Sequence, residues 1–196
     1  MPNLPLYKMV ISSDTESELE VDYVALVDKP AIEKNFLKFD SVELRFNTDA
    51  DRRIISGPAM LADTPIYRRD ADMGEYLVTF DAATIEQIAQ KFFRKGFNQN
   101  FNLMHNPEMK LSGVTVFESF IVDPARGIQP MKGFEDSPAG SWFISAKVDN
   151  DEAWKLIQED KIKGFSVEGI FQYKKAKLSK EETWNQIEAL MISLIQ

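Results

Sequence analysis

The stretch KGFSVEG, residues 163–169, runs on as IFQY to residue 173 and decides how the fold is interpreted. Its aromatic and β-branched residues are typical of a strand, in which alternate side chains share one face. The face expected to be buried carries Phe165, Val167, Gly169 and Phe171. Ser166 therefore lies on the opposite face with Glu168, and the nearby Gly164 lets a substrate or another backbone come close.

Several other runs have the composition of strands. Together, the strands are predicted at residues 6–12, 20–27, 35–39, 53–61, 75–80, 101–105, 114–122, 142–148 and 164–173. So many strands predict an α+β fold, in which a curved, mostly antiparallel β-sheet or barrel is flanked by about three helices.

Three segments have the hydrophobic spacing and the capping residues of helices. The first follows Asp81 as its N-cap and stops at Gly96. The second spans about residues 150–160, with Asp149 and Glu152 at capping-box spacing. The third begins at Ser179 and is amphipathic.

We predict one domain over residues 1–173. Within it, residues 124–140 contain three prolines and three glycines, which is typical of a mobile loop. Residues 174–196 form the C-terminal amphipathic helix, which packs on the domain or binds a partner.

Composition excludes several classes of function. The 196 residues contain 23 Lys and Arg against 31 Asp and Glu, a net charge of -8, which argues against nucleic-acid binding as the main task. The chain has no cysteine and one histidine, so we expect no disulfide, no thiolate metal site and no multi-histidine zinc site, and we predict no cofactor. No run of 18 apolar residues and no secretory signal pattern is present, so we expect a cytoplasmic protein without membrane contact.

The single histidine, His105, is in phase with apolar strand residues, and so is a carboxylate, Glu118, between Val116 and Phe120. An unpaired carboxylate on an apolar face costs several kcal/mol. We therefore expect Glu118 to accept from one imidazole nitrogen while the other nitrogen faces Ser166, as in serine hydrolysis. The alternative is an ordinary strand serine and a histidine with structural partners in the core.

The motif around the serine is not the Gly-x-Ser-x-Gly of α/β-hydrolases, because Glu168 stands at the fifth position. The segments YVALVDKPAIEKNFLKF, VFESFIVD, GSWFISAKVDNDEAWKLI and KGFSVEGIF follow one another over residues 23–171, with the histidine among them. In this order they resemble the XkdF-like serine proteases of tailed phages, a branch of the prohead proteases related in fold to herpesvirus assemblin.

This resemblance implies that residues 1–173 are a serine protease domain with Ser166 as nucleophile and His105 as general base. Assemblin-type enzymes use a second histidine as the third member, which this chain lacks. Glu118 is the preferred replacement, and Glu168, two residues from the serine on the same strand face, is the rival.

The resemblance also implies a place of action. The enzyme would cut scaffold protein, major capsid protein and itself inside the assembling procapsid, in the host cytoplasm. One alternative is a non-catalytic head-assembly protein that uses the same fold for binding, and another is a small-molecule esterase with a deep apolar pocket. The oligomeric state is open, with a homodimer as one alternative.

Overall fold

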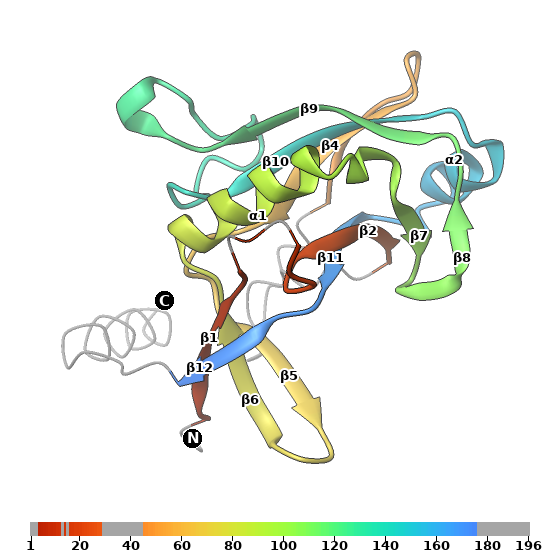
Figure 1. Ribbon diagram of the computed structural model, residues 1–196. Coiled ribbons are helices and arrows are strands. Elements are labelled where there is room, and N and C mark those ends of the chain that lie inside the picture. Colours follow the sequence, from red (N-terminus) through yellow and green to blue (C-terminus); the bar gives the residue numbers. More distant parts are fainter. Residues whose placement is uncertain (1–3, 13, 15, 29–44, 176–196) are drawn as a thin grey trace, which may run out of the picture.

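The computed structural model describes residues 4–12, 14, 16–28 and 45–175. This part of the chain forms three four-stranded sheets, shown in Figure 1. The β1 sheet has the order β12 (Gln172–Lys175), β1 (Leu6–Val10), β6 (Gly74–Thr79), β5 (Ile66–Asp70). The β10 sheet has the order β3 (Asn47–Asp49), β4 (Ile54–Met60), β10 (Trp142–Val148), β9 (Val114–Ile121). The β2 sheet has the order β11 (Gly164–Gly169), β2 (Val21–Val27), β7 (Phe101–Leu103), β8 (Asn106–Leu111).

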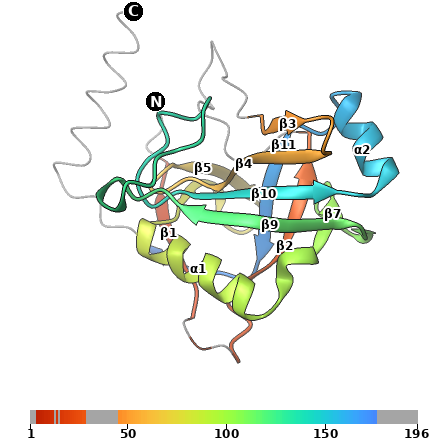
Figure 2. The same cartoon turned by 90° about the horizontal axis from the view of Figure 1, so that it is seen from above.

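The strand pairs are antiparallel except β1 with β6 and β2 with β7, so the expectation of mostly antiparallel pairing is confirmed. The barrel alternative is wrong, because the three sheets have separate edges and do not close on themselves among the described residues. Figure 2 shows the strands of the β10 sheet running across those of β2 and β11.

Two α-helices flank the sheets in the described ranges. α1 (Ala82–Arg94) begins as predicted, since the Asp81 side chain accepts from the Thr84 N–H at 2.8 Å. α2 (Asp151–Gln158) is capped by Asn150, which accepts from the Ala153 N–H at 2.9 Å, so the expected Asp149 cap is wrong. Two 3-10 turns, η1 (Phe97–Gln99) and η2 (Pro124–Arg126), complete the helical elements. The helix predicted from Ser179 and the strand at 35–39 lie outside the described residues.

The predicted strand at 164–173 is in fact two strands of two different sheets. β11 pairs with β2, and after residues 170 and 171 β12 pairs with β1. Gly169 marks the change, because a Cβ there would lie 1.9 Å from the carbonyl oxygen of Glu20. This close approach of two backbones needs glycine.

One hydrophobic core joins all three sheets and both helices. Its largest fully buried side chains include Trp142, Phe92, Phe101 and Phe165. A second, smaller cluster lies under the predicted loop at 124–140, where buried Phe134 meets the Phe143 ring at 5.6 Å between centroids. This anchor gives the loop a fixed packing point, whereas its mobility stays a prediction.

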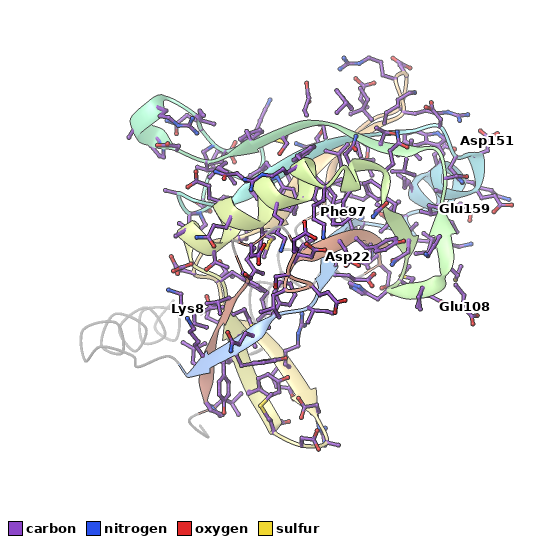
Figure 3. All side chains as sticks on the ribbon, viewed as in Figure 1. Lys8, Asp22, Phe97, Glu108, Asp151 and Glu159 are labelled. Atoms are coloured by element: carbon purple, nitrogen blue, oxygen red, sulfur yellow. The ribbon has the colours of Figure 1, made fainter. Side chains whose placement is uncertain are left out.

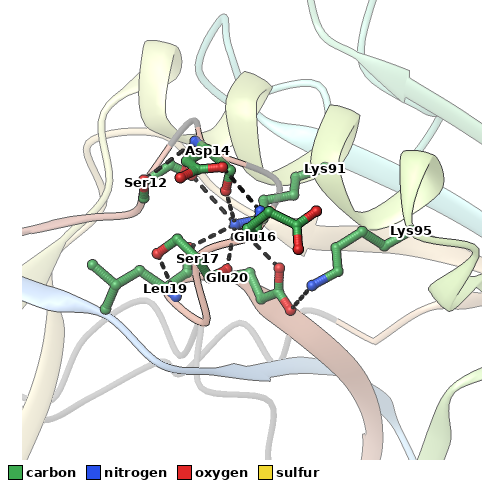
Figure 4. Close-up of polar contacts among 8 residues, drawn as sticks. All are labelled: Ser12, Asp14, Glu16, Ser17, Leu19, Glu20, Lys91 and Lys95. Atoms are coloured by element: carbon green, nitrogen blue, oxygen red, sulfur yellow. Dashed lines mark hydrogen bonds and ion pairs between the residues drawn. The ribbon is translucent and has the colours of Figure 1, made fainter.

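A buried lysine ties α1 to the segment between β1 and β2, as Figure 4 shows. The Lys91 ammonium donates to the carbonyl oxygens of Asp14 and Ser17, both at 2.7 Å, and lies 3.1 Å from Glu20 Oε2 as an ion pair. Lys95 Nζ lies 2.5 Å from the other oxygen of Glu20. These two carbonyl oxygens thus accept from a lysine side chain of α1 and not from the backbone of a neighbouring strand.

In the view of Figure 3, half-buried Asp22 lies near the centre, whereas Glu108 and Glu159 lie at the edge and point outward. Across the described ranges, no helix is both long enough and apolar enough to cross a membrane.

Candidate active site

Ser166 lies on β11, where it is paired in register with Ala25 of β2, and only 4% of the residue is exposed. Its neighbour Phe165 belongs to the core and contacts Phe46, with 5.5 Å between ring centroids. The strand is therefore held on its Phe165 side, and the hydroxyl of Ser166 is directed away from that side.

His105 stands at the tip of the β7–β8 hairpin. β7 ends at Leu103, which pairs with Asn106, so the prediction of a strand through His105 is wrong. The two residues of the turn have positive φ, 53° at Met104 and 57° at His105. A two-residue hairpin loop with positive φ at both positions matches the right-handed twist of its strands. Positive φ is unusual for methionine, and such strain is concentrated at functional sites.

The imidazole of His105 bridges two side chains of β11. Its Nε2 lies 3.0 Å from Ser166 Oγ, and its Nδ1 lies 3.0 Å from Glu168 Oε1. A carboxylate can only accept, so Nδ1 carries the proton in the neutral ring and Nε2 accepts from the serine hydroxyl. The structure thus brings Ser166, His105 and Glu168 together.

Glu118, the preferred third member in the sequence analysis, is not in this array. The alternation that placed it on an apolar face breaks at a β-bulge, where Ser145 pairs with Glu118 but Ala146 pairs with Val116. The extra residue, Phe117, shifts the phase, so Glu118 is exposed and lines a small polar pocket with Asn47. The carboxylate beside His105 is the rival, Glu168.

Sequence reasoning also missed Asn102. It lies on β7 opposite Ala25, in the same row of the β2 sheet as Ser166, and is 2% exposed. Its Nδ2 donates to Glu168 Oε1 at 2.5 Å. The signal was an amide between two buried apolar residues of a strand, a position where a polar side chain needs a partner.

A further carboxylate, Asp22, is the extra residue of a β-bulge in β2, between Tyr23, which pairs with Glu168, and Val21, which pairs with Gly169. Burial raises the pKa of Asp22, and the negative charges of Glu168 and Glu20 act in the same direction, although its own backbone N–H opposes them. Asp22 therefore takes up a proton at a higher pH than an ordinary aspartate does. It lies near Glu168, the carboxylate that contacts His105.

The array opens on a groove of about 580 Å³. The groove is lined by Met9, Arg68, Val78, Phe80, His105, Val167, Glu168, Gly169, Phe171 and Tyr173. A small pocket of about 40 Å³ adjoins Ser166 and shares Arg68, Phe80, Val167 and Phe171 with the groove. The walls thus combine apolar and aromatic side chains with two charged ones, Arg68 and Glu168.

A hydroxyl, an imidazole that can take its proton and a carboxylate that orients the imidazole form the constellation of a serine hydrolase. The comparison with known families agrees. The chain matches the family described as "Putative phage serine protease XkdF" over residues 41–175, more than half of its length. It therefore belongs to this family, and the resemblance drawn from its motifs is confirmed.

The matched segment contains His105, Ser166 and Glu168, and begins after β1 and β2. No curated protein and no solved structure matches the chain. The relation to the assemblin fold stays a prediction.

Proposed function

We propose that this protein is the serine endopeptidase of a tailed phage that cuts scaffold and capsid proteins, and itself, during procapsid maturation. The observation that carries the proposal is the single histidine, which contacts Ser166 with one nitrogen and Glu168 with the other. Membership of a phage serine protease family supports the same activity. The site of action is the interior of the assembling procapsid in the host cytoplasm.

In the proposed mechanism, Ser166 Oγ attacks the scissile carbonyl carbon while its proton passes to Nε2 of His105. The imidazolium so formed is stabilised by Glu168 across Nδ1. It returns the proton to the leaving amine as the C–N bond breaks and an acyl-serine remains. A water molecule then gives its proton to the same nitrogen, attacks the acyl group and restores the serine.

The shape of the site favours a peptide over a small ester. The space directly beside Ser166 is about 40 Å³, which is small for an acyl-binding cavity, whereas the adjoining groove is much larger. β5 and β11 are edge strands of their sheets in the described part of the chain, and both contribute to the walls of this site. We expect the substrate to bind as an extended strand along such an edge.

A serine-directed fluorophosphonate tests the nucleophile, and co-expression with the phage's own capsid and scaffold proteins tests the substrates. We expect Ser166→Ala to abolish labelling and processing, since removal of a triad serine costs about a million-fold in rate. Ser112→Ala, an exposed serine outside the site, is the matched control and should behave as wild type. Unchanged processing by Ser166→Ala would refute the protease proposal and favour the non-catalytic head-assembly alternative.

A further inference from the structure

Asn102 is among the few buried polar residues in the described part of the chain, with 2% exposure, and the mechanism above gives it no role. It shares a row of the β2 sheet with Ser166, separated by the small side chain of Ala25. The two side chains therefore project from the same face of the sheet.

The oxygen that His105 contacts is also the oxygen that Asn102 contacts. Glu168 Oε1 lies 3.0 Å from His105 Nδ1 and 2.5 Å from Asn102 Nδ2. The amide must point its nitrogen at this oxygen, because the reverse orientation would oppose two acceptors. One carboxylate oxygen is thus held between two donors.

The amide oxygen of Asn102 has surroundings different from those of its nitrogen. Asn102 Oδ1 is buried and has no hydrogen-bond partner among the residues that the structure describes. Buried polar atoms are nearly always paired, so a buried amide is an unusual side chain for this position. Among the described residues, the hydrogen bond of this side chain is the one from Nδ2 to Glu168.

We infer that Asn102 is a positioning residue of the proposed active site, so this inference rests on the proposed function. It fixes Oε1 of Glu168 where the Nδ1–H of His105 can donate to it. Glu168 has a flexible side chain that is 26% exposed, and without the amide it can turn toward solvent. The imidazole then loses the partner that selects the Nδ1-protonated tautomer, and Nε2 is less often free to accept from Ser166.

The single histidine makes this testable by NMR, because all imidazole signals of the chain come from His105. The ¹⁵N shifts of the neutral ring report which nitrogen carries the proton. We compare wild type with Asn102→Ala, which removes the amide, and Asn102→Leu, which also keeps water out of its place. Asn100→Ala is the control, since that amide donates to the Asp22 carbonyl oxygen at 2.9 Å just before the same strand.

We expect both Asn102 variants to lower the fraction of the Nδ1-protonated tautomer and to slow fluorophosphonate labelling about 10- to 100-fold, the range found when an orienting partner of a metal-binding histidine is lost. Asn100→Ala should change neither. The inference is overturned if either folded Asn102 variant keeps the wild-type tautomer, or if Asn100→Ala alters it equally. Because the tautomer is measured without substrate, a wild type that never reacts with the probe would refute the proposed function and leave the test of Asn102 intact.

Discussion

At the residue scale, Glu168 and Glu118 are the two candidates for the carboxylate that orients His105. Their surroundings in the structure differ. Glu168 contacts His105 and Asn102 and has a side chain 26% exposed. Glu118 is exposed on β9, after the bulge at Phe117. Only a carboxylate that touches the imidazole can select its tautomer and stabilise the imidazolium.

The same substitution at both positions tests this assignment. We expect Glu168→Gln to lower kcat/KM about 10,000-fold, because an amide that can donate favours the wrong tautomer of the base. Glu118→Gln should stay within twofold of wild type. Steady-state kinetics on a capsid-protein peptide, with circular dichroism as a check of folding, measure both. A large loss in Glu118→Gln with none in Glu168→Gln would restore the original preference.

Residue identity indicated two members of the candidate site. Ser166 was evident because a hydroxyl stood between glycines in a strand, and His105 because it is the only histidine. Strand phase placed Glu118 on an apolar face because phase is counted along one chain, whereas the bulge beside Glu118 depends on the partner strand. Asn102 was missed because a contact between β7 and β11 crosses β2, and no spacing in the sequence encodes which strands become neighbours.

At the scale of the elements, the sequence was most informative where local signals agree. α1 was predicted from its cap and apolar stripe, and both are present. Three strands were missed, β3, β5 and β8, which are largely polar and exposed. Such edge strands are stabilised by pairing with a neighbour rather than by their own composition. The hairpin β7–β8 matters most, because its turn carries the histidine.

The strand β5 also makes a testable contribution to substrate binding. Arg68 lines both the groove and the pocket beside Ser166, and it forms no ion pair with a carboxylate in the described part of the chain. Such a cation attracts an acidic side chain, because the carboxylate on the groove wall, Glu168, is already held by His105 and Asn102. We therefore expect substrates with Asp or Glu near the scissile bond to be preferred, since a hydrogen bond to a charged group contributes about 1.5–3 kcal/mol.

Arg68→Ala should lower kcat/KM for such a substrate about 10- to 100-fold, which corresponds to that range of free energy. The adjacent Arg69 provides a control with the same change of charge, because alternation places its side chain on the other face of the hairpin. Peptides that differ only by Glu or Gln near the cleavage point measure the preference. Equal losses in Arg68→Ala and Arg69→Ala would mean that only the net charge matters.

At the scale of the whole molecule, three sheets with separate edges depend on one core and on a few polar ties between distant segments. The Lys91 cluster is such a tie, because it joins α1 to the chain that leads from the β1 sheet into β2. No motif predicted it, since its acceptors are mostly backbone oxygens and any residue carries those. Measuring how much Lys91 contributes to the free energy of unfolding therefore tests how α1 and the segment before β2 are held together.

Lys91 and Lys95 both pair with Glu20, but their side chains are 4% and 30% exposed. Lys91→Met keeps the approximate shape and removes the charge, so that the carbonyl oxygens of Asp14 and Ser17 lose their donor and Glu20 loses one of its two ion pairs. Breaking a buried pair costs about 3–5 kcal/mol, or a fall in Tm of about 6–20 °C for a chain of this size. Lys95→Met should cost about 1 kcal/mol or less, because water reaches that ammonium.

Thermal and urea unfolding measure this difference, and a double variant identifies its source. If the Glu20 carboxylate causes the loss of stability because it keeps only Lys95 as a partner, adding Glu20→Gln to Lys91→Met should recover part of the stability. Recovery should be incomplete, since the carbonyl oxygens of Asp14 and Ser17 still lack a donor. Equal Tm values for Lys91→Met and Lys95→Met would show instead that the segment before β2 is held by its apolar contacts, with the buried ammonium contributing nothing to the fold.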